Sequence, residues 1–482
     1  LNKLASETAH FTQAYTVVAR TFPSWVSILT GQYPHTHGIR HMFPAPTKEG
    51  LAVPSSIVWA FAKAGYRTGV ITDAAGEIFS RVDLGFEHTD APEFTLKSNV
   101  ELGGVKRHIH LMPYIVDVDK GEQVPQLNAM ERLGDPFWLT ARATDWITAG
   151  DPRPFFLTLF YSAGHFPFAS PAPFYRRFVD PEYRGRSRFA KATFGKPLEG
   201  AAGRAEHKQI RGLYAGAVAA SDAAIGELLE TLEALGLLKN TIVVITADHG
   251  ENLYEHGLGV GHGDHLYGPA GHHVPLIMKW PGLAGGEKIT RRVRTVDIAS
   301  SLLQLAGITA PTKRDGTSLV KDAKPAVTSD RPIYAETGLW FFPPETKRLD
   351  GKRIQLFDGF SAFGFQPKTT KIYLDPSYNE SVVMAKHRML VQDDFKLLYI
   401  PTRDGVRWEL YDAARDPWDL KDLSKDKKHA ATLAKLKKAL YGWLLSDKKM
   451  IRVGEFVLPR RALGRKADGA PPTAAPAEGG AQ

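Results

Sequence analysis

A short apolar run that ends in Asp-His-Gly constrains this chain more than any other feature of its sequence. Residues 241–252 read Thr-Ile-Val-Val-Ile-Thr-Ala-Asp-His-Gly-Glu-Asn, so β-branched and apolar residues lead directly to Asp248, His249 and Gly250. Such a run predicts a strand covered on both faces, and open α/β sheets bind ligands beyond the carboxyl ends of these strands. Gly250 allows a tight turn there. We therefore expect two metal-ligand side chains at a sheet edge, although an isolated pair is read equally well as a helix-capping Asp248 beside a surface His249.

The loop after this predicted strand is rich in glycine and histidine. Thr-Ala-Asp-His-Gly-Glu at 246–251 is followed by Glu-His-Gly at 255–257, Gly-His-Gly at 261–263, and Val-Pro-Leu-Ile-Met-Lys-Trp-Pro-Gly at 274–282. This order of motifs closely resembles the sulfatase family of the alkaline-phosphatase superfamily. The resemblance implies an α/β fold in which a large mixed sheet is sandwiched by helices, with a smaller C-terminal α+β domain. It also implies a metal-dependent ester hydrolase.

Composition limits the other function classes. The 482 residues are 43% hydrophobic, which is ample for a large core and more than one average domain uses. The net charge of +9 is modest, and Lys and Arg look spread along the chain, so we expect no nucleic-acid partner. A cationic surface would still help to draw in the small anionic ester that the resemblance implies as substrate. The absence of cysteine excludes disulfides, zinc-thiolate sites and a cysteine-derived catalytic group. No run is long enough to span a membrane and no signal peptide is visible, which leaves the compartment open between exported and cytoplasmic.

The first fifteen residues read as an amphipathic helix that is already under way. In the sulfatase family, such a helix follows the first core strand, and the end of that strand carries a pair of aspartates that bind the metal. Nothing in this sequence matches that strand. We therefore expect the beginning of the domain to be missing from the sequence.

A proline and a glycine mark a short helix in the next segment. The helix is expected to start behind Pro23 and to stop at Gly31, which places Thr21 at its N-terminus, where backbone N–H groups favour an anion. On its own, Thr21 is read most simply as the N-cap. Thr-Phe-Pro-Ser at 21–24 also resembles the family motif Cys/Ser-x-Pro-Ser-Arg, whose first residue becomes the formylglycine nucleophile of sulfatases. In this chain that residue is Thr21, and Trp25 replaces the arginine.

The replacement by threonine predicts different chemistry. Formylglycine forms by oxidation of the β-carbon of Cys or Ser, and the same oxidation of threonine would give a ketone, so Thr21 is expected to stay a plain hydroxyl. A metal-bound hydroxyl is the nucleophile of the phosphatase and phosphodiesterase branches of the superfamily, where Thr-Phe-Pro also occurs. This favours a phosphate ester over a sulfate ester as substrate.

Two further segments bear on the anion site. The run at 154–160 predicts another buried strand, and His165 follows it in a His-x-Pro pattern that matches the substrate-binding histidine of the family. A lone histidine after a strand is more often structural. After the strand predicted near Thr72, Thr-Asp-Ala-Ala-Gly-Glu at 72–77 stands in place of the Gly-Lys-x-His motif with which many sulfatases hold sulfate, so two expected anion ligands are absent.

The resemblance also suggests a third histidine and the metal. His262 stands where many sulfatases have a lysine that holds the ester, and an imidazole there could donate a proton to the leaving oxygen or a hydrogen bond to the anion, unless it is a loop histidine held by a carbonyl. Asp248, His249 and Thr21 are the predicted metal ligands. Because imidazole is a poor calcium ligand, zinc or manganese is favoured, with calcium as the alternative.

The rest of the chain predicts the domain organisation. Residues 1–330 form the catalytic α/β domain and include a helix from about His207 to Leu235. Residues 331–450 form a small domain of antiparallel strands, at 381–385 and in later runs, with a helix from about Lys428 to Leu445. Residues 451–482 form a tail rich in Ala, Pro and Gly. No function is drawn from His108 or His110.

These patterns predict a metal-dependent hydrolase of anionic esters that uses Thr21 as nucleophile and favours phosphate mono- or diesters. A sulfuric ester hydrolase of the arylsulfatase type is the first alternative. A phospho-group transferase or a catalytically silent binding protein is the second, because the family's pair of aspartates has no counterpart in the sequence. The alcohol half of the substrate and the oligomeric state are not predicted.

Overall fold

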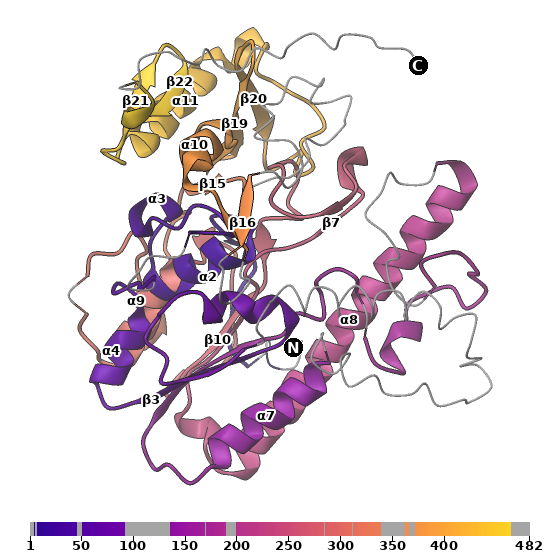
Figure 1. Ribbon diagram of the computed structural model, residues 1–482, viewed down its shortest axis with the longest axis vertical. Coiled ribbons are helices and arrows are strands. Elements are labelled where there is room, and N and C mark those ends of the chain that lie inside the picture. Colours follow the sequence, from indigo (N-terminus) through magenta and orange to yellow (C-terminus); the bar gives the residue numbers. More distant parts are fainter. Residues whose placement is uncertain are drawn as a thin grey trace.

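The computed structural model describes residues 4, 7–45, 51–91, 135–168, 170–188, 199–283, 285–310, 312–338, 362–365 and 372–463. The histidines at 108 and 110 and the tail beyond 463 lie outside these residues. Figure 1 shows a larger α/β part below and a smaller part above, where the chain from about residue 372 gathers. Helices and strands alternate in the larger part, so the protein has the mixed α/β class expected from the sequence.

One sheet of the larger part brings together segments from both ends of the catalytic region. Its strands are ordered β11-β1-β10-β6: β1 pairs in parallel with β11 and antiparallel with β10, which pairs antiparallel with β6. Their bounds are β1 Ala9–Phe11, β6 Val243–Thr246, β10 Leu276–Lys279 and β11 Glu287–Ile289. The helix predicted for the first fifteen residues is therefore wrong from Ala9 to Tyr15, where β1 and the two-residue β2 (Ala14–Tyr15) lie. Pairing with two distant strands overrides the local helical pattern.

A second sheet is parallel and three-stranded, in the order β4-β3-β5. Its strands are β3 Arg67–Thr72, β4 His88–Asp90 and β5 Phe155–Phe160. Ser56 caps the helix that leads into β3, α4 (Ile57–Lys63), and Gly65 has a φ of +88° where the chain turns. Figure 1 shows the long helix α8 (Gly200–Ala234) running beside α7 (Pro136–Thr148). The helix predicted from His207 thus begins seven residues earlier.

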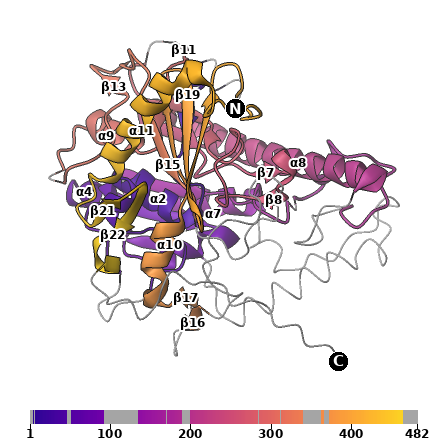
Figure 2. The same ribbon diagram turned by 90° about the horizontal axis from the view of Figure 1, so that it is seen from above.

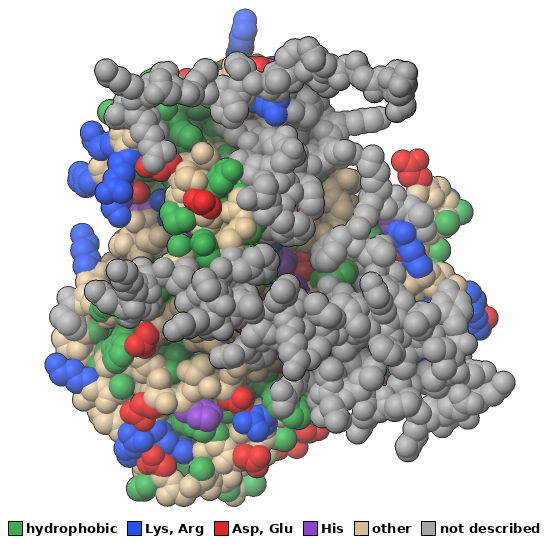
Figure 3. Space-filling model, in the orientation of Figure 1, with side chains coloured by type: hydrophobic (Ala, Val, Ile, Leu, Met, Phe, Trp, Pro, Cys, Tyr) green, Lys and Arg blue, Asp and Glu red, His purple; other side chains and the backbone are tan. Residues whose placement is uncertain are grey.

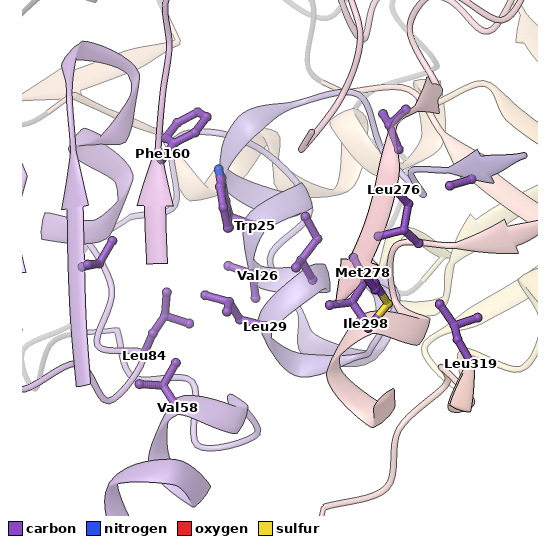
Figure 4. Close-up of a cluster of buried hydrophobic side chains, with 14 of the residues drawn as sticks. Trp25, Val26, Leu29, Val58, Leu84, Phe160, Leu276, Met278, Ile298 and Leu319 are labelled. Carbon is purple, nitrogen blue, oxygen red and sulfur yellow. The ribbon is translucent and has the colours of Figure 1, made fainter. Parts of the chain in front are cut away.

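The main core lies around α2 (Thr21–Thr30), all ten residues of which are buried. Figure 4 shows Trp25 beside Phe160 on one side of this helix, with Met278, Ile298 and Leu319 grouped on the other. These residues come from α2, from both sheets and from α9 (Asp297–Leu305). A helix buried all round cannot shift without disturbing packing on every face, so its N-terminus is held firmly.

The smaller part is built on an antiparallel sheet in the order β15-β18-β19-β20, covered by α11 (Ala430–Leu444). Its strands are β15 Ile333–Glu336, β18 Arg388–Gln392, β19 Phe395–Thr402 and β20 Gly405–Asp412. The helix α11 confirms the helix predicted near Lys428. The strand predicted at 381–385 is wrong, because these residues lie in α10 (Asn379–Ala385), where Val382 and Ala385 face a small apolar cluster. A hairpin, β21 (Met450–Val453) and β22 (Phe456–Pro459), occupies the first part of the segment expected to be a tail.

Short strands complete the fold, and Figure 2 shows several of them from above. The three-stranded sheet β12-β2-β9 and the two-stranded ladders β7-β8, β13-β14 and β16-β17 involve β7 Asn252–Leu253, β8 Val260–Gly261, β9 His273–Val274, β12 Val293–Arg294, β13 Val320–Lys321, β14 Lys324–Pro325, β16 Phe363–Phe365 and β17 Ile372–Leu374. A short helix, α3 (Pro34–His37), follows α2. No helix within the described ranges is both long and apolar enough to cross a membrane.

Candidate active site

Thr21 is the first residue of α2 and is 3% exposed. The preceding Arg20 is extended, with φ −147° and ψ 130°, and Gly31 ends the helix with a φ of +67°. The helix therefore begins two residues before the predicted start, and Pro23 occupies its first turn, where no intrahelical N–H is needed. The position expected for Thr21 at the helix N-terminus is confirmed, although the N-cap is Arg20 and not Thr21.

Ser24 fixes this helix end against the strand that delivers Asp248. The Ser24 hydroxyl donates to the Asp248 carbonyl at 2.6 Å and is 3.0 Å from the Thr16 hydroxyl. Both side chains are fully buried, so the bond is not shared with water. The serine of the Thr-Phe-Pro-Ser motif thereby sets the spacing between Thr21 and the residues after β6.

Thr21 and His249 meet directly. Thr21 Oγ1 is 3.2 Å from His249 Nε2, and the other ring nitrogen, Nδ1, is 2.9 Å from the Gly250 carbonyl. A carbonyl can only accept, so Nδ1 carries the proton and Nε2 presents a lone pair. The Thr21 hydroxyl then donates to Nε2. A carbonyl that fixes the tautomer in this way is a common support for a metal-binding histidine.

Asp248 completes a group of three oxygen and nitrogen donors. Its Oδ2 is 3.3 Å from His249 Nε2 but has no hydrogen-bond partner, although the atom is buried. A carboxylate oxygen and an imidazole lone pair at this distance repel each other unless a cation or a proton lies between them. The donor set therefore fits a divalent cation. The described residues contain no cluster of three or more His, Asp or Glu suited to a metal, so Asp248 and His249 supply only part of a coordination sphere.

His262 stacks close to this group. Its ring centroid is 4.0 Å from that of His249 and 5.3 Å from that of His165. His262 Nδ1 is 3.2 Å from the nearer carboxylate oxygen of Glu251, and both side chains are buried. Burial, followed by the neighbouring His249 and Arg20, lowers the pKa of His262 well below its ordinary value. The imidazole is thus neutral near pH 7, so it is not the protonated acid that the proton-donor interpretation requires.

His165 is held by the turn after β5. Its Nδ1 donates to the Phe166 carbonyl at 2.8 Å, and its backbone N–H donates to the Ser162 carbonyl at 2.8 Å. Burial lowers the pKa of His165. The Ser162 N–H in turn donates to both carboxylate oxygens of Asp73, at 3.2 and 3.0 Å. Asp73, directly after β3, therefore positions the turn that carries His165.

Sequence reasoning missed Arg20. Its guanidinium forms an ion pair with Asp264, and its side chain passes two glycines so closely that a Cβ on Gly338 would come within 2.0 Å of Arg20 Cγ. A Cβ on Gly263, whose φ is +75°, would lie 2.3 Å from the Ala19 carbonyl oxygen. Both glycines are needed for this approach. No sequence motif marks Arg20, because its contacts near the site are with residues more than two hundred positions away in the sequence.

Both departures from the family motifs have a structural counterpart. Trp25, which replaces the motif arginine, packs edge to face against Phe79 and Phe160, with centroids 5.4 and 5.1 Å apart, so it belongs to the core. The segment that replaces the Gly-Lys-x-His motif contributes Asp73, whose carboxylate is bound by the backbone. Neither residue offers a cation to an anionic group.

All five predicted site residues thus lie in one region. Thr21, Asp248 and His249 are linked by the distances above, and His262 and His165 follow through ring contacts. Their assignment to catalysis or metal binding remains a prediction.

Comparisons with known proteins bear on the family of this chain. A sequence model of the sulfatase family matches residues 1–308. Arylsulfatase K of Canis lupus familiaris is 36% identical over 129 residues, which are 27% of this chain and 24% of that protein. The ulvan-active sulfatase of Formosa agariphila is 28% identical over 342 residues, 67% of this chain and 60% of that protein. The matched region thus spans between about a quarter and three fifths of these two relatives.

A solved structure extends the likeness to nearly the whole chain. The phosphonate monoester hydrolase of Silicibacter pomeroyi superposes with a TM-score of 0.65 at 20% identity, covering 95% of this chain and 94% of that one. At this identity the likeness concerns the fold alone. Together with the match of the family model over more than half of the residues, it leads to one conclusion: the chain belongs to the sulfatase family.

Proposed function

We propose that this protein is a metal-dependent hydrolase of anionic esters that uses Thr21 as its nucleophile and prefers phosphate mono- or diesters. The observation that carries the proposal is the contact of Thr21 Oγ1 with the lone pair of His249 Nε2, 3.2 Å away, beside the unpartnered Oδ2 of Asp248. The hydroxyl is the only nucleophile type available at this motif position, since threonine cannot yield formylglycine.

Asp248, His249 and Thr21 are the residues that would hold the cation. Zinc or manganese suits this set better than calcium, because imidazole nitrogen is a poor calcium ligand. A divalent ion bound there would lower the pKa of the hydroxyl and offset the negative charge of the ester. The buried positions of these side chains keep bulk water away from the hydroxyl.

Thr21 then acts as follows. The Thr21 hydroxyl gives up its proton to solvent or a neighbouring base, and its oxygen forms a bond to phosphorus while the bond from phosphorus to the ester oxygen breaks. The departing oxygen takes up a proton from solvent or a neighbouring acid and leaves as the alcohol. The phosphothreonine that results is hydrolysed by water, which restores the hydroxyl and releases phosphate. Thr21 lies at the N-terminus of α2, where the helix dipole favours the negative charge of the anion during both steps. His165 and His262 border the same space and are proposed to contact the non-bridging oxygens or the leaving oxygen.

The chemistry of threonine is the reason to favour phosphate. Formylglycine releases sulfate by collapse of a hemiacetal, and this needs a second hydroxyl on the same carbon. A sulfated threonine has no such route, whereas a phosphothreonine can be opened by in-line attack of water on phosphorus. The phosphonate monoester hydrolase among the structural neighbours acts on a phosphorus ester, as its name states.

Sulfate ester hydrolysis is the second candidate. The family model and the ulvan-active sulfatase support it, since both are named for sulfate esters. This reaction requires a route in which Thr21 is not sulfated. In one such route, water attacks the sulfate ester directly.

A panel of esters with one aryl alcohol tests the proposal. The protein, loaded with zinc or manganese, is assayed on the aryl phosphate, phosphodiester, phosphonate and sulfate. We expect at least one phosphorus ester to have the highest kcat/KM. Thr21→Ala should abolish turnover and Thr21→Ser should retain part of it, because the hydroxyl carries the chemistry. Thr30→Ser, a change of the same type at the other end of α2, is the control for folding. Sulfate turnover above every phosphorus ester, unaffected by Thr21→Ala, contradicts the proposal.

A further inference from the structure

The small domain carries nearly all of the net charge of the protein. Residues 421–461, which form α11 and the β21–β22 hairpin, hold 12 of the 61 Lys and Arg but only 4 of the 52 Asp and Glu. Their net charge is +8, against +9 for the whole chain, so the other 441 residues are almost neutral. The even spread of Lys and Arg expected from the sequence does not hold here. We refer to the cations of residues 421–461 as the cationic face.

These cations point to solvent and have few partners. Eleven of the twelve are exposed, and Lys437 is the exception. Among the described residues, only Lys435 and Lys437 of this set reach a carboxylate, Asp393 at 2.9 Å and Glu455 at 3.4 Å respectively. Asp447, one of the four acids, is turned inward, 3.5 Å from Arg40 of the catalytic part. The face is thus a surplus of positive charge.

The helix spreads this charge along one side. Lys428, Lys435 and Lys438 are seven and three residues apart, which places them on one stripe of a helical path. Lys435 and Lys438 lie in α11 and Lys428 lies in the 3-10 turn before it (Lys427–His429), so the stripe extends over roughly 15 Å at the α-helical rise. The opposite stripe, Leu436, Leu440 and Leu444, is buried in the core of the small domain.

The hairpin adds a second cluster at the far end of the helix. Arg460 donates from its backbone N–H and its Nε to the carbonyls of Lys449 and Lys448, at 2.8 and 2.9 Å. Lys448, Lys449, Arg460 and Arg461 are all exposed. Figure 3 shows Lys and Arg side chains gathered at the upper left, over the part of the surface where Figure 1 places α11 and β21.

Fold stability does not explain this face. Like charges spaced along one stripe repel, and every apolar contact of α11 is made by its other side. A partner of opposite charge removes the repulsion. Because the cations form a row and not a single pocket, that partner is a chain with repeated negative charges.

Two other anionic partners fit less well. Insertion into a lipid surface needs an exposed apolar face, but α11 buries its own. Leu420 and Trp418, directly before the face, and Val453 within it are exposed, so the vesicles in the test below decide this alternative. Nucleic-acid readers favour arginine and aromatic rings, whereas nine of the twelve cations are lysines and the exposed stripe of α11 carries none of its aromatic residues.

We propose that the cationic face binds a linear polysaccharide that carries sulfate or phosphate groups, and so retains a polymeric substrate on the enzyme. The part of this statement that concerns substrate rests on the proposed function. The face is fixed to the catalytic part by the ion pair of Asp447 with Arg40, and by the Gly338 N–H, which donates to the Gly263 carbonyl beside the site at 2.8 Å. A polymer held on the small domain is thereby retained on the molecule that carries the candidate site.

The affinity should depend on salt. If about five lysines each displace a counterion, with a slope of roughly 0.7 per contact, the association constant falls about 100-fold between 0.05 and 0.2 M salt. A pocket that binds one anion through two or three contacts would lose about 7- to 20-fold.

Binding of labelled dextran sulfate to the metal-loaded protein tests the proposal. Uncharged dextran, phosphatidylserine vesicles and a short DNA duplex are compared in the same buffer. The variant of the face replaces five lysines by glutamine at positions 428, 435, 438, 448 and 449. The matched control makes the same exchange at five exposed lysines elsewhere, at positions 63, 239, 288, 321 and 324.

We expect dextran sulfate to bind and dextran not to bind. The face variant should bind dextran sulfate at least tenfold more weakly, the control variant should change less than twofold, and kcat/KM for a small aryl ester should be the same in all three proteins. Equal weakening in both variants would show that only net charge matters, and would overturn the proposal. Binding of the vesicles or the DNA as tight as that of dextran sulfate would also overturn it.

The binding assay involves no turnover, so the two proposals fail separately. If dextran sulfate binds through the cationic face while no ester is hydrolysed, the proposed function is wrong and the proposal for the cationic face is supported. If esters are hydrolysed and the face variant binds dextran sulfate as tightly as wild type, the proposal for the cationic face is wrong and the proposed function is unaffected.

Discussion

Burial of Asp73 makes the stability of this protein depend on pH in a way that can be measured. The carboxyl group lies directly after β3 and its residue is 1% exposed. It accepts hydrogen bonds from Ser162, which favour the ionised form, but desolvation is the larger effect and raises the pKa from 3.8 to about 6. In the folded state Asp73 therefore keeps its proton to a higher pH than in the unfolded chain.

The sign and the size follow from this shift. Because the folded pKa lies above the unfolded one, the contribution of Asp73 is fully present below about pH 4 and is lost as pH rises to about 6. A shift of about two units corresponds to about 3 kcal/mol at most, at 1.36 kcal/mol per unit. Above about pH 6 the carboxylate is ionised in the folded state, and the fold has lost this contribution of about 3 kcal/mol.

Asp73→Asn removes the charge at every pH while keeping the shape. We expect urea unfolding at pH 4.5, 5.5, 6.5 and 7.5 to show that the free energy of unfolding of wild type falls by about 2 kcal/mol relative to the variant across this range. Asp145→Asn, at an exposed position of α7, is the control for general charge effects. Parallel curves for wild type and Asp73→Asn would refute the reasoning. A difference that moves in favour of wild type as pH rises would show that the bonds from Ser162 outweigh burial.

Three further predictions concern the candidate site. His262→Ala should slow esters of good and poor leaving groups to a similar degree, because burial keeps the imidazole neutral; a loss confined to poor leaving groups, measured as kcat over a series of aryl esters, would instead establish proton donation. Ser24→Ala should lower kcat more than it changes KM and should reduce the free energy of unfolding by about 1–3 kcal/mol in urea titrations, because it leaves the Asp248 carbonyl without its buried donor. Zinc or manganese at about 100 times Kd should stabilise the protein by about 2.7 kcal/mol in thermal unfolding, and His249→Ala should remove this gain; stoichiometric calcium without any transition metal in the purified protein would contradict the choice of ion.

The grouping of the site could be predicted because strands deliver residues to predictable places. Asp248 and His249 follow β6, His165 follows β5, and the glycine-rich loop returns His262 to them. The strand itself differs from the expectation, since the residues of β6 are only half-buried. A position at one end of the described sheet order leaves them less covered than their apolar run suggests.

The features that could not be predicted depend on contacts between residues far apart in the sequence, which no local sequence pattern indicates. Ala9–Phe11 form a strand and not a helix because they pair with β10 and β11, which lie far away in the sequence. Residues 381–385 are β-branched in part, yet they pack as a helix against a small cluster of the second domain. Glu251, Arg20 and Asp73 could not be assigned, because the role of each depends on a neighbour that only the fold brings close.

The central claim is that Thr21 forms a covalent bond with the substrate, and trapping that bond tests it most directly. The metal-loaded protein is mixed with an aryl phosphate, quenched in acid within the first turnover, and the peptide that contains Thr21 is analysed by mass spectrometry. The account predicts a phosphoryl group on Thr21 that disappears once substrate is exhausted, and a sulfuryl group that persists and stalls turnover when the aryl sulfate is used. The claim would be contradicted if the aryl sulfate were hydrolysed faster than every phosphorus ester while Thr21 stayed unmodified throughout.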